Sequence, residues 1–381
     1  MRIGLNLLYA HPGIGGAWNY IEGIVEALAR FGSENEYFAY VHDSSRCLVP
    51  DLPNFHVRSV RINGARRMMR VLSEHMLLPK LVSRDKLDVL HWFGNVNGLV
   101  RCQAACFVSI HDVKAFDLGS IHGFALRDLY MRLLLPYTAR TTKTLLPVSQ
   151  TTALRVKKWF GVAERRMQVI PPPINEKFQP ASPDDVSALR VSRKLPSQFW
   201  LYVSHYYPHK NHRRLFQAYA GLRRLEPTTW KLVLCGRKNG AETMLNRWMS
   251  EAGIEDHVIW LSDLSRSDMP TLFTAATVLI YPSEYEGGGI PVMEAMACGC
   301  PVVASRIPAI VESTGGMAVL FEPSQVADIT RSMLRAVTEI GLLENLAKGG
   351  RERIEAQRPA RIAAKLLCAY RSAGVEAELN Q

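Results

Sequence analysis

The sequence predicts an α/β protein with two domains, each a parallel sheet that carries helices on both faces. Its 381 residues exceed the usual size of one domain and suffice for two complete cores. Short apolar runs typical of buried strands alternate with stretches whose apolar residues recur at helical spacing. Because parallel strands need crossover connections, usually helices, this alternation is typical of doubly covered parallel sheets.

The first strand is predicted at residues 2–8, followed by a glycine-rich loop and a helix at 18–31. A strand, a glycine turn and a helix are the beginning of a Rossmann-like unit. The loop holds Gly13, Gly15 and Gly16, one glycine fewer than a strict dinucleotide fingerprint requires. This incomplete fingerprint argues against an NAD-dependent oxidoreductase.

Further strands are predicted in the first half of the chain at residues 56–60, 88–92, 106–110 and 144–148. Ligands of such sheets bind at the carboxyl ends of the strands. His111 follows the strand at 106–110 directly and therefore lies at that edge. A histidine hydrogen-bonded locally at a strand end is the alternative interpretation.

In the second half, a strand at 199–204 leads through a loop to a helix that begins near Asn211. Lys210 lies just before this helix, where a cation and unpaired N–H groups can converge on an anion. A lysine that is simply solvated is the alternative.

A run of three glycines, Gly287, Gly288 and Gly289, follows the apolar strand predicted at 277–281 and precedes a helix at 291–297. Glycines can point successive backbone N–H groups at one spot, and the start of a helix adds positive potential. We interpret this arrangement as an anion site, most simply one for phosphate.

Two carboxylates, Glu286 and Glu294, frame the glycine run. A carboxylate beside a phosphate site repels the phosphate unless it has another task, such as accepting hydrogen bonds from ribose hydroxyls. A glycine-rich turn with two solvated glutamates is the alternative, and glycine motifs alone do not exclude it.

The segment EGGGIPVMEAMACGCPVVAS at residues 286–305 resembles the pattern EGFGLPxLEAMACGxPVV of the retaining glycosyltransferases of family GT4, which have the GT-B fold. Gly288 stands where the family usually has Phe. In the family the first Glu lies beside the donor sugar, the second binds the nucleotide ribose, and the loop amides hold the diphosphate. The resemblance implies these roles for Glu286, for Glu294, and for the loop from Gly287 through Ile290.

The family pattern Gly-Arg-x4-Lys-Asn resembles Ser204-His205-x4-Lys210-Asn211. The resemblance implies that Lys210 binds the donor diphosphate. His205 replaces the usual Arg, and a neutral histidine has neither a fixed charge nor a bidentate fork. Either His205 is protonated near the phosphates, or a neighbour such as Arg237 supplies the charge.

Three further assignments rest on the resemblance. It implies that Gly15 and Gly16 lie in a loop over the donor diphosphate and the acceptor, and that His111 faces the donor sugar. It also implies that backbone atoms near Leu264 meet the nucleobase.

The resemblance implies two Rossmann-like domains that face a central cleft, with a C-terminal helix crossing back to the first domain. The expected bounds are 1–175 for an acceptor-side domain, 190–358 for a nucleotide-sugar-binding domain and 359–381 for the final helix. The chain at 171–183 contains three consecutive prolines, which make it a stiff connection.

The net charge of +11 is concentrated in part in segment 58–86, whose apolar residues also recur at helical spacing. A basic amphipathic helix can lie on anionic lipid, and a core-packed helix with a solvated basic face is the alternative. No nucleic-acid reader motif is recognisable, so nucleic acid is not an expected partner.

The resemblance to family GT4 implies a hexosyltransferase that moves a sugar from a UDP-, GDP- or ADP-linked donor to a hydroxyl of a glycan or lipid-linked glycan, with retention of configuration. Glu286, Lys210 and His111 are the expected catalytic residues. No Asp-x-Asp element follows a strand, so we expect neither a metal nor a cofactor. A sugar-nucleotide-binding protein without activity and a sugar-nucleotide epimerase remain the alternatives.

The sequence also predicts a location. Seven cysteines without a zinc-like double pair fit a reducing compartment, and the first residues lack the apolar core of a signal peptide. We therefore expect a cytoplasmic protein, which would be peripheral on the inner face of the membrane if the basic segment lies on anionic lipid and not on the protein core.

Overall fold

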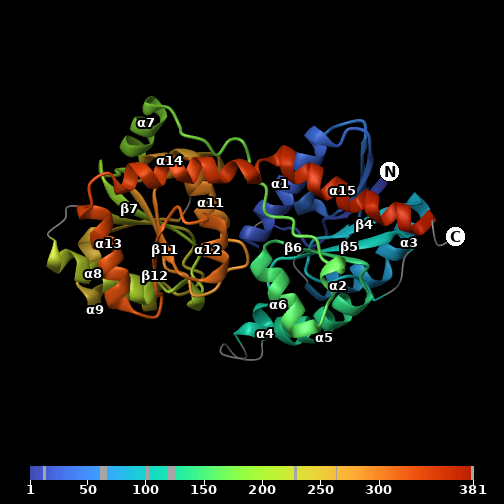
Figure 1. Ribbon diagram of the computed structural model, residues 1–381, viewed down its shortest axis with the longest axis horizontal. Coiled ribbons are helices and arrows are strands. Elements are labelled where there is room, and N and C mark those ends of the chain that lie inside the picture. The colour runs from blue at the N-terminus through green and yellow to red at the C-terminus, as the bar shows by residue number, and fades with distance from the viewer. Residues whose placement is uncertain are drawn as a thin grey trace. The chain divides into compact units, whose positions relative to one another are not determined.

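The computed structural model describes residues 1–11, 14–60, 67–99, 103–118, 126–226, 230–262 and 264–378 (Figure 1). The chain forms two compact units. Unit 1 consists of Met1–Pro173 together with Gln357–Gln381, and unit 2 consists of Ile174–Ala356.

The described strands of unit 1 form a six-stranded parallel sheet in the order β3-β2-β1-β4-β5-β6. Their bounds are β1 Arg2–Asn6, β2 Glu36–Val41, β3 Phe55–Ser59, β4 Val89–Trp92, β5 Ala105–Ile110 and β6 Thr144–Pro147. The strand order reverses between β1 and β4, which are neighbours. In parallel sheets such a reversal leaves a crevice at the carboxyl ends of the strands, where ligands bind.

The described helices of unit 1 are α1 Gly16–Phe31, α2 Arg67–Met76, α3 Leu78–Asp85, α4 Lys114–Asp117, α5 Leu126–Thr141, α6 Gln150–Phe160 and α15 Pro359–Glu378, with the 3₁₀ turns η1 Asp43–Leu48 and η2 Glu164–Arg166. The last helix, α15, packs against α1, the first helix of the chain. Tyr370 of α15 is fully buried, and its hydroxyl lies 2.6 Å from Nδ1 of His91 in β4. The C-terminal helix therefore completes the core of unit 1.

Unit 2 repeats the same plan, with a parallel sheet in the order β12-β11-β10-β7-β8-β9. The strands are β7 Phe199–Val203, β8 Lys231–Cys235, β9 Val258–Leu261, β10 Val278–Tyr281, β11 Val302–Ser305 and β12 Val319–Phe321. Here the order reverses between β10 and β7. The apolar runs predicted as strands at 199–204 and 277–281 are these two neighbouring strands.

The described helices of unit 2 are α7 Pro183–Arg193, α8 His212–Leu225, α9 Glu242–Ala252, α10 Met269–Ala275, α11 Ile290–Ala297, α12 Pro308–Thr314, α13 Val326–Thr338 and α14 Leu342–Ile354, with the 3₁₀ turns η3 Pro208–Lys210, η4 Glu255–His257, η5 Arg266–Asp268 and η6 Glu355–Gln357, which bridges into unit 1. Helix α8 packs with α9 and α13, whereas α11 packs with α10, α12 and α14. This grouping follows from right-handed crossovers that run in opposite directions from the middle of the sheet.

The helices of both units are short or carry charges. Among the described residues, no helix combines the length and the apolar character that crossing a bilayer would require.

Candidate functional site

The loops that follow β7 and β10 lie side by side in unit 2, because these strands are parallel neighbours. The backbone N–H of Glu284, in the second loop, donates to the carbonyl of His209, in the first, at 2.8 Å. The Ser283 hydroxyl donates to the same carbonyl at 3.3 Å. Residues 204–211 and 282–289 therefore form one connected edge of the sheet.

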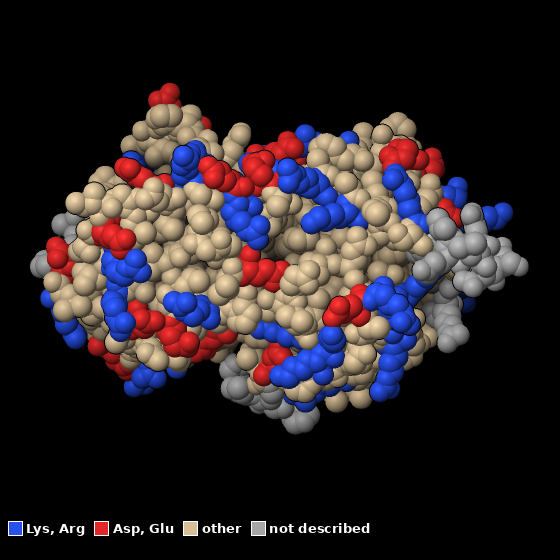
Figure 2. Space-filling view, in the orientation of Figure 1, with Lys and Arg blue, Asp and Glu red and all other residues tan. Residues whose placement is uncertain are grey.

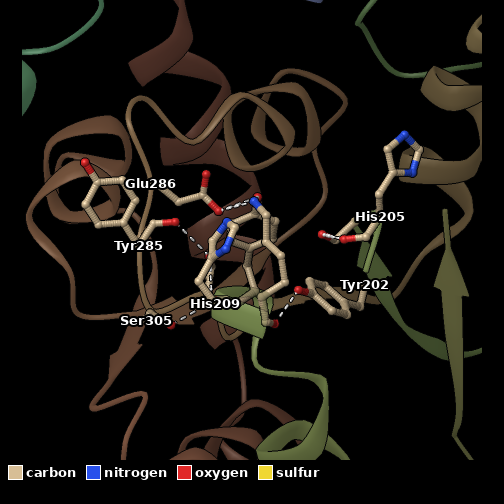
Figure 3. A network of polar contacts seen from close by, with 10 residues as sticks. Tyr202, His205, His209, Tyr285, Glu286 and Ser305 are labelled. Atoms are coloured by element: carbon tan, nitrogen blue, oxygen red, sulfur yellow. Dashed lines mark hydrogen bonds and ion pairs between the residues drawn. The ribbon is translucent and has the colours of Figure 1, made fainter. Parts of the chain in front are cut away.

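Lys210 and Glu286 meet at this edge. The ammonium of Lys210 lies 2.5 Å from Oε1 of Glu286, and the two side chains are only 16% and 12% exposed. The hydroxyl of Tyr281, the last residue of β10, donates to the same carboxylate oxygen at 2.9 Å and lies 3.2 Å from the Lys210 ammonium. In Figure 3 the Glu286 carboxylate lies within this network. The three groups form a closed triangle of an acid, a cation and a hydroxyl.

The backbone that carries Lys210 is fixed by its neighbours. Tyr202 of β7 donates its hydroxyl to the Lys210 carbonyl at 2.6 Å. Asn211 adopts the left-handed conformation, with φ of 61°, which Asn tolerates better than most residues. Its side-chain amide donates to the carbonyls of Pro282 and Pro323 at 3.1 and 2.8 Å. The Lys210 side chain thus starts from a rigid point.

The glycine run ends at the N-cap of α11. Gly289 has φ of 64°, and a Cβ at this position would lie 2.8 Å from Cδ1 of Ile310 and 3.2 Å from Oγ of Ser313. Both the backbone conformation and the lack of space require glycine here. The N–H of Ile290 belongs to the first turn of α11, where a helix offers no carbonyl partner. This edge can accept an anion beside Lys210.

Glu294 projects from α11 and is 2% exposed. Its Oε1 accepts a hydrogen bond of 2.5 Å from Arg266, whose guanidinium also lies 4.5 Å from the centre of the Phe178 ring. A buried carboxylate needs such a partner, because an unpaired charge is costly to bury. The Arg266 side chain is 38% exposed and so brings the pair to the surface of unit 2.

Leu264 lies between β9 and η5, two residues before Arg266. It is half-buried and packs on the core of unit 2. The position predicted to meet the nucleobase is therefore close in the chain to the Arg266–Glu294 pair.

His205 follows β7 and is held by the next loop of the sheet. Its Nδ1 accepts a hydrogen bond of 3.0 Å from the backbone N–H of Arg237. Burial, and then the charges of Arg237 and Lys210, lower the pKa of His205. The ring is therefore neutral at pH 7, with its proton on Nε2, and in Figure 3 it points away from Glu286. A protonated His205 is the less favourable of the two alternatives.

Gly236 allows this arrangement of the two loops. Its φ is 142°, and a Cβ there would collide with the backbone carbonyl of Ser204. Glycine therefore lets the segment that begins after β8 approach the loop that carries His205. Arg237 comes next and is exposed, so its charge is available beside His205.

In unit 1, the predicted loop residues Gly15 and Gly16 lie at the start of α1. Gly15 is the N-cap, with φ of 66°, and a Cβ at this position would meet open space. Gly16 is the first residue of the helix. Gly13, the third glycine of the motif, lies outside the described residues.

His111 lies at the carboxyl end of β5, as expected. Its Nε2 donates to the carbonyl of Phe93 at 2.8 Å, and its backbone N–H donates to the side chain of Asn95 at 2.6 Å. The ring meets Tyr20 edge-on at 5.0 Å, and burial lowers the pKa of His111. His111 is therefore a fixed, neutral imidazole whose Nδ1 can accept a hydrogen bond.

The structure brings Lys210 and Glu286 into direct contact and leaves Glu294 with Arg266. Sequence reasoning missed three residues of this edge: Tyr202, Tyr281 and Arg266. Both tyrosines stand in apolar strands and read as core residues. Their places near the carboxyl ends of β7 and β10, where such sheets bind ligands, were the available signal.

Two family models match the chain. Residues 190–353 match the model described as "Glycosyl transferases group 1". Residues 14–178 match the model described as "Glycosyltransferase Family 4". Between them the two models account for most of the chain, one in each half.

A curated relative is the O-antigen chain mannosyltransferase B of Escherichia coli. It is 28% identical over 257 residues, which are 67% of this chain and 67% of the relative. The similarity therefore extends over about two thirds of each protein.

Solved structures show the same fold. Sucrose-phosphate synthase from Thermosynechococcus elongatus superposes with a TM-score of 0.77 at 19% identity and covers 98% of both chains. HepE of Anabaena, in complex with UDP-glucose, superposes with a TM-score of 0.76 at 18% identity, over 98% of this chain and all of that one. The predicted GT-B fold is confirmed.

Proposed function

Because the chain belongs to glycosyltransferase family GT4, we propose that it moves a hexose from a nucleoside-diphosphate sugar to a hydroxyl of a glycan or lipid-linked glycan intermediate, with retention of configuration. The observation that supports this proposal most directly is the ion pair of Lys210 and Glu286, in the loops that precede α8 and α11. A cation and helix amides suit a diphosphate, and a carboxylate next to them suits the sugar hydroxyls.

The donor lies along the edge of unit 2 in this proposal. Lys210, with the backbone of Gly287 to Ile290, holds the diphosphate, and Arg237 adds charge beside the neutral His205. Glu294 accepts hydrogen bonds from the ribose hydroxyls, and backbone atoms near Leu264 meet the base. Lys210 and the glycine run lie on neighbouring loops at one edge of the sheet, and the half-exposed Arg266 brings the buried Glu294 to the surface of unit 2.

The chemical step breaks the bond between the anomeric carbon and the diphosphate oxygen. Negative charge grows on that oxygen, and positive groups already in place stabilise it most in the transition state. The acceptor oxygen bonds to the anomeric carbon from the same face, and its proton passes to the departing phosphate. Glu286 orients the sugar, and no covalent enzyme intermediate forms.

The acceptor side falls to unit 1. Gly15, at the open N-cap of α1, lets a substrate approach the backbone closely, and Gly16 begins the helix behind it. His111 presents Nδ1 as a hydrogen-bond acceptor toward the sugar. The working domains are 1–175 for the acceptor and 190–358 for the donor, with 359–381 returning to the first.

The comparisons guide the choice of donor. The curated relative is named a mannosyltransferase, and the Anabaena structure holds UDP-glucose. Mannose and glucose donors are therefore the first to test. The charge on the leaving group is balanced by protein cations and amides, so the reaction is proposed to be metal-independent and to need no cofactor.

We place the protein at the cytoplasmic face of a membrane, held by basic side chains of unit 1. Lys80 and Arg84 of α3 are exposed, whereas Arg58 forms an ion pair with Asp85. Figure 2 shows further lysine and arginine side chains over the part of unit 1 where Figure 1 places α5 and α6. Of segment 58–86, residues 61–66 lie outside the described residues.

The proposal is tested by a thermal-shift screen of UDP-, GDP- and ADP-sugars, followed by transfer assays with the radiolabelled donor that binds. A donor must raise the melting temperature, because it binds only the folded state. Transfer to a glycan acceptor, with α configuration kept by NMR and with activity retained in EDTA, supports the proposal. Binding without transfer to any acceptor favours the inactive binding protein, and an epimerised product favours the epimerase.

A further inference from the structure

This inference rests on the proposed donor site, in which Lys210 binds the diphosphate. In the structure, the Lys210 ammonium is already paired with the carboxylate of Glu286. Oε1 of Glu286 lies 2.5 Å from the Lys210 ammonium and accepts a hydrogen bond from Tyr281, and both charged side chains are largely removed from water. In such surroundings a carboxylate offsets much of the attraction that the ammonium would exert on a diphosphate. An arriving diphosphate therefore meets a cation that is already neutralised.

A donor sugar can replace Lys210 as the partner of the Glu286 carboxylate, whereas a nucleoside diphosphate without a sugar cannot. Hydroxyls of a donor sugar can donate hydrogen bonds to the Glu286 carboxylate, so the acid gains partners when Lys210 turns to the diphosphate. Without a sugar, the carboxylate keeps only part of its stabilisation and faces the anion. A charge left with fewer partners in a poorly hydrated site costs free energy.

We propose that Glu286 discriminates between the loaded donor and the spent nucleotide, by masking Lys210 until sugar hydroxyls take over its place at the carboxylate. The ligand favoured is a nucleoside diphosphate that carries a polyhydroxylated ring, and the same nucleotide without the ring binds more weakly. The consequence for the enzyme is weak inhibition by its nucleotide product.

Tyr281 is the positioning residue of this device. It is 1% exposed and donates to the oxygen of Glu286 that also faces Lys210. Burial raises the pKa of Tyr281, so its hydroxyl stays protonated and remains a donor. When Lys210 turns away, this hydrogen bond holds the carboxylate in place for the sugar.

The test is isothermal titration calorimetry of the full chain with the pairs UDP and UDP-glucose, and GDP and GDP-mannose. Glu286→Gln removes the negative charge at nearly constant shape. The variant is expected to bind the free nucleotide roughly tenfold more tightly, because Lys210 no longer has an anionic partner. It is expected to bind the nucleotide sugar more weakly, because the sugar hydroxyls lose a charged acceptor. Masking predicts that the affinity for the free nucleotide rises while the affinity for the nucleotide sugar falls.

Glu284→Gln is the matched control. Glu284 lies in the same loop but pairs with Arg214 at 2.6 Å, so both affinities should stay at the wild-type values. Tyr281→Phe should weaken the nucleotide sugar while it leaves the free nucleotide nearly unchanged. Thermal unfolding of each variant verifies that it folds.

The outcomes separate this inference from the proposed function. If Glu286→Gln lowers the affinity for the nucleotide sugar but does not raise the affinity for the free nucleotide, the masking proposal is wrong and the donor site is supported. If the wild-type chain binds neither member of any pair, or Lys210→Ala binds both as tightly as wild type, the donor site itself is wrong and masking is lost with it.

Discussion

Arg266 donates a hydrogen bond of 2.5 Å to Oε1 of Glu294, a carboxylate that is 2% exposed and stands in the helix after the glycine run. Sequence reasoning assigned Glu294 to the ribose and did not foresee its partner. The ion pair holds the carboxylate in one orientation and offsets the cost of burying its charge.

Replacement of Glu294 by alanine should weaken binding of the nucleoside diphosphate by about 1–3 kcal/mol, since hydrogen bonds from ribose hydroxyls to a charged acceptor are lost. Calorimetry with the nucleotide that binds wild type measures the change. Glu339→Ala, which removes an exposed partner of Arg335 on α13, is the control and should have wild-type affinity. Equal affinities for the two variants would remove Glu294 from the site.

Lys210→Ala should lower kcat more than it raises the Kd for the nucleotide sugar. The reason is that the charge on the departing diphosphate is greatest in the transition state, where a fixed cation acts most strongly. Steady-state kinetics together with calorimetry separate the two effects. Lys348, exposed on α14, provides a lysine-to-alanine control in the same unit. A kcat equal to that of wild type would refute the assignment of Lys210.

Unit 2 should lose stability in acid because of His212. Burial, and then the charge of Lys210, lower the pKa of this histidine to about 3. The unfolded chain binds the proton near the ordinary pKa of ~6.5, so the stabilisation is complete above that pH and falls by about 1.4 kcal/mol per pH unit down to the folded value.

The measurement for this prediction is urea unfolding between pH 7 and pH 4.5. His212→Phe keeps an aromatic ring beside Trp260, whose ring lies stacked at 6.0 Å, and should flatten the dependence on pH. An unchanged slope in the variant would show that His212 is not the titrating group.

Reversal of two charges on α3, in the double variant Lys80→Glu and Arg84→Glu, should reduce binding to vesicles with anionic lipid. Each basic residue near an anionic surface contributes about 1 kcal/mol, so the loss should be large at low salt and small at high salt. Co-sedimentation with anionic and neutral vesicles measures it. Lys194→Glu and Lys348→Glu, on unit 2, form the charge-matched control. If the wild-type protein does not co-sediment with anionic vesicles, the membrane proposal is wrong.

Much of the fold was predictable because its signals are local. The apolar runs at 199–204 and 277–281 are strands, and Gly289 and Pro291 mark the start of α11, since glycine suits a left-handed N-cap and proline suits the first helical turn. The site roles inferred from the GT4 resemblance stay predictions. Their residues were found from motif spacing, which does not depend on tertiary contacts.

The contacts of the site could not be predicted in this way. Lys210 and Glu286 are separated by 76 residues, and their meeting depends on β7 being the neighbour of β10. The state of His205 was open in the sequence, because its pKa depends on burial and on two charges from other loops. Tyr281 was indistinguishable from a core residue, since its hydroxyl acquires a role only beside that pair.

The sequence by itself determined the plan of the protein, which has two parallel sheets with a lysine, a glycine run and two acids at strand ends, and it carries the resemblance to family GT4. Periodicity, glycine positions and motif spacing are properties of short segments, so they can be read without coordinates. Only the tertiary structure decided which charges neutralise one another. Electrostatic partners depend on distance and burial, and the triangle of Lys210, Glu286 and Tyr281 forms because β7 and β10 are neighbours and hydrogen bonds join the loops that follow them.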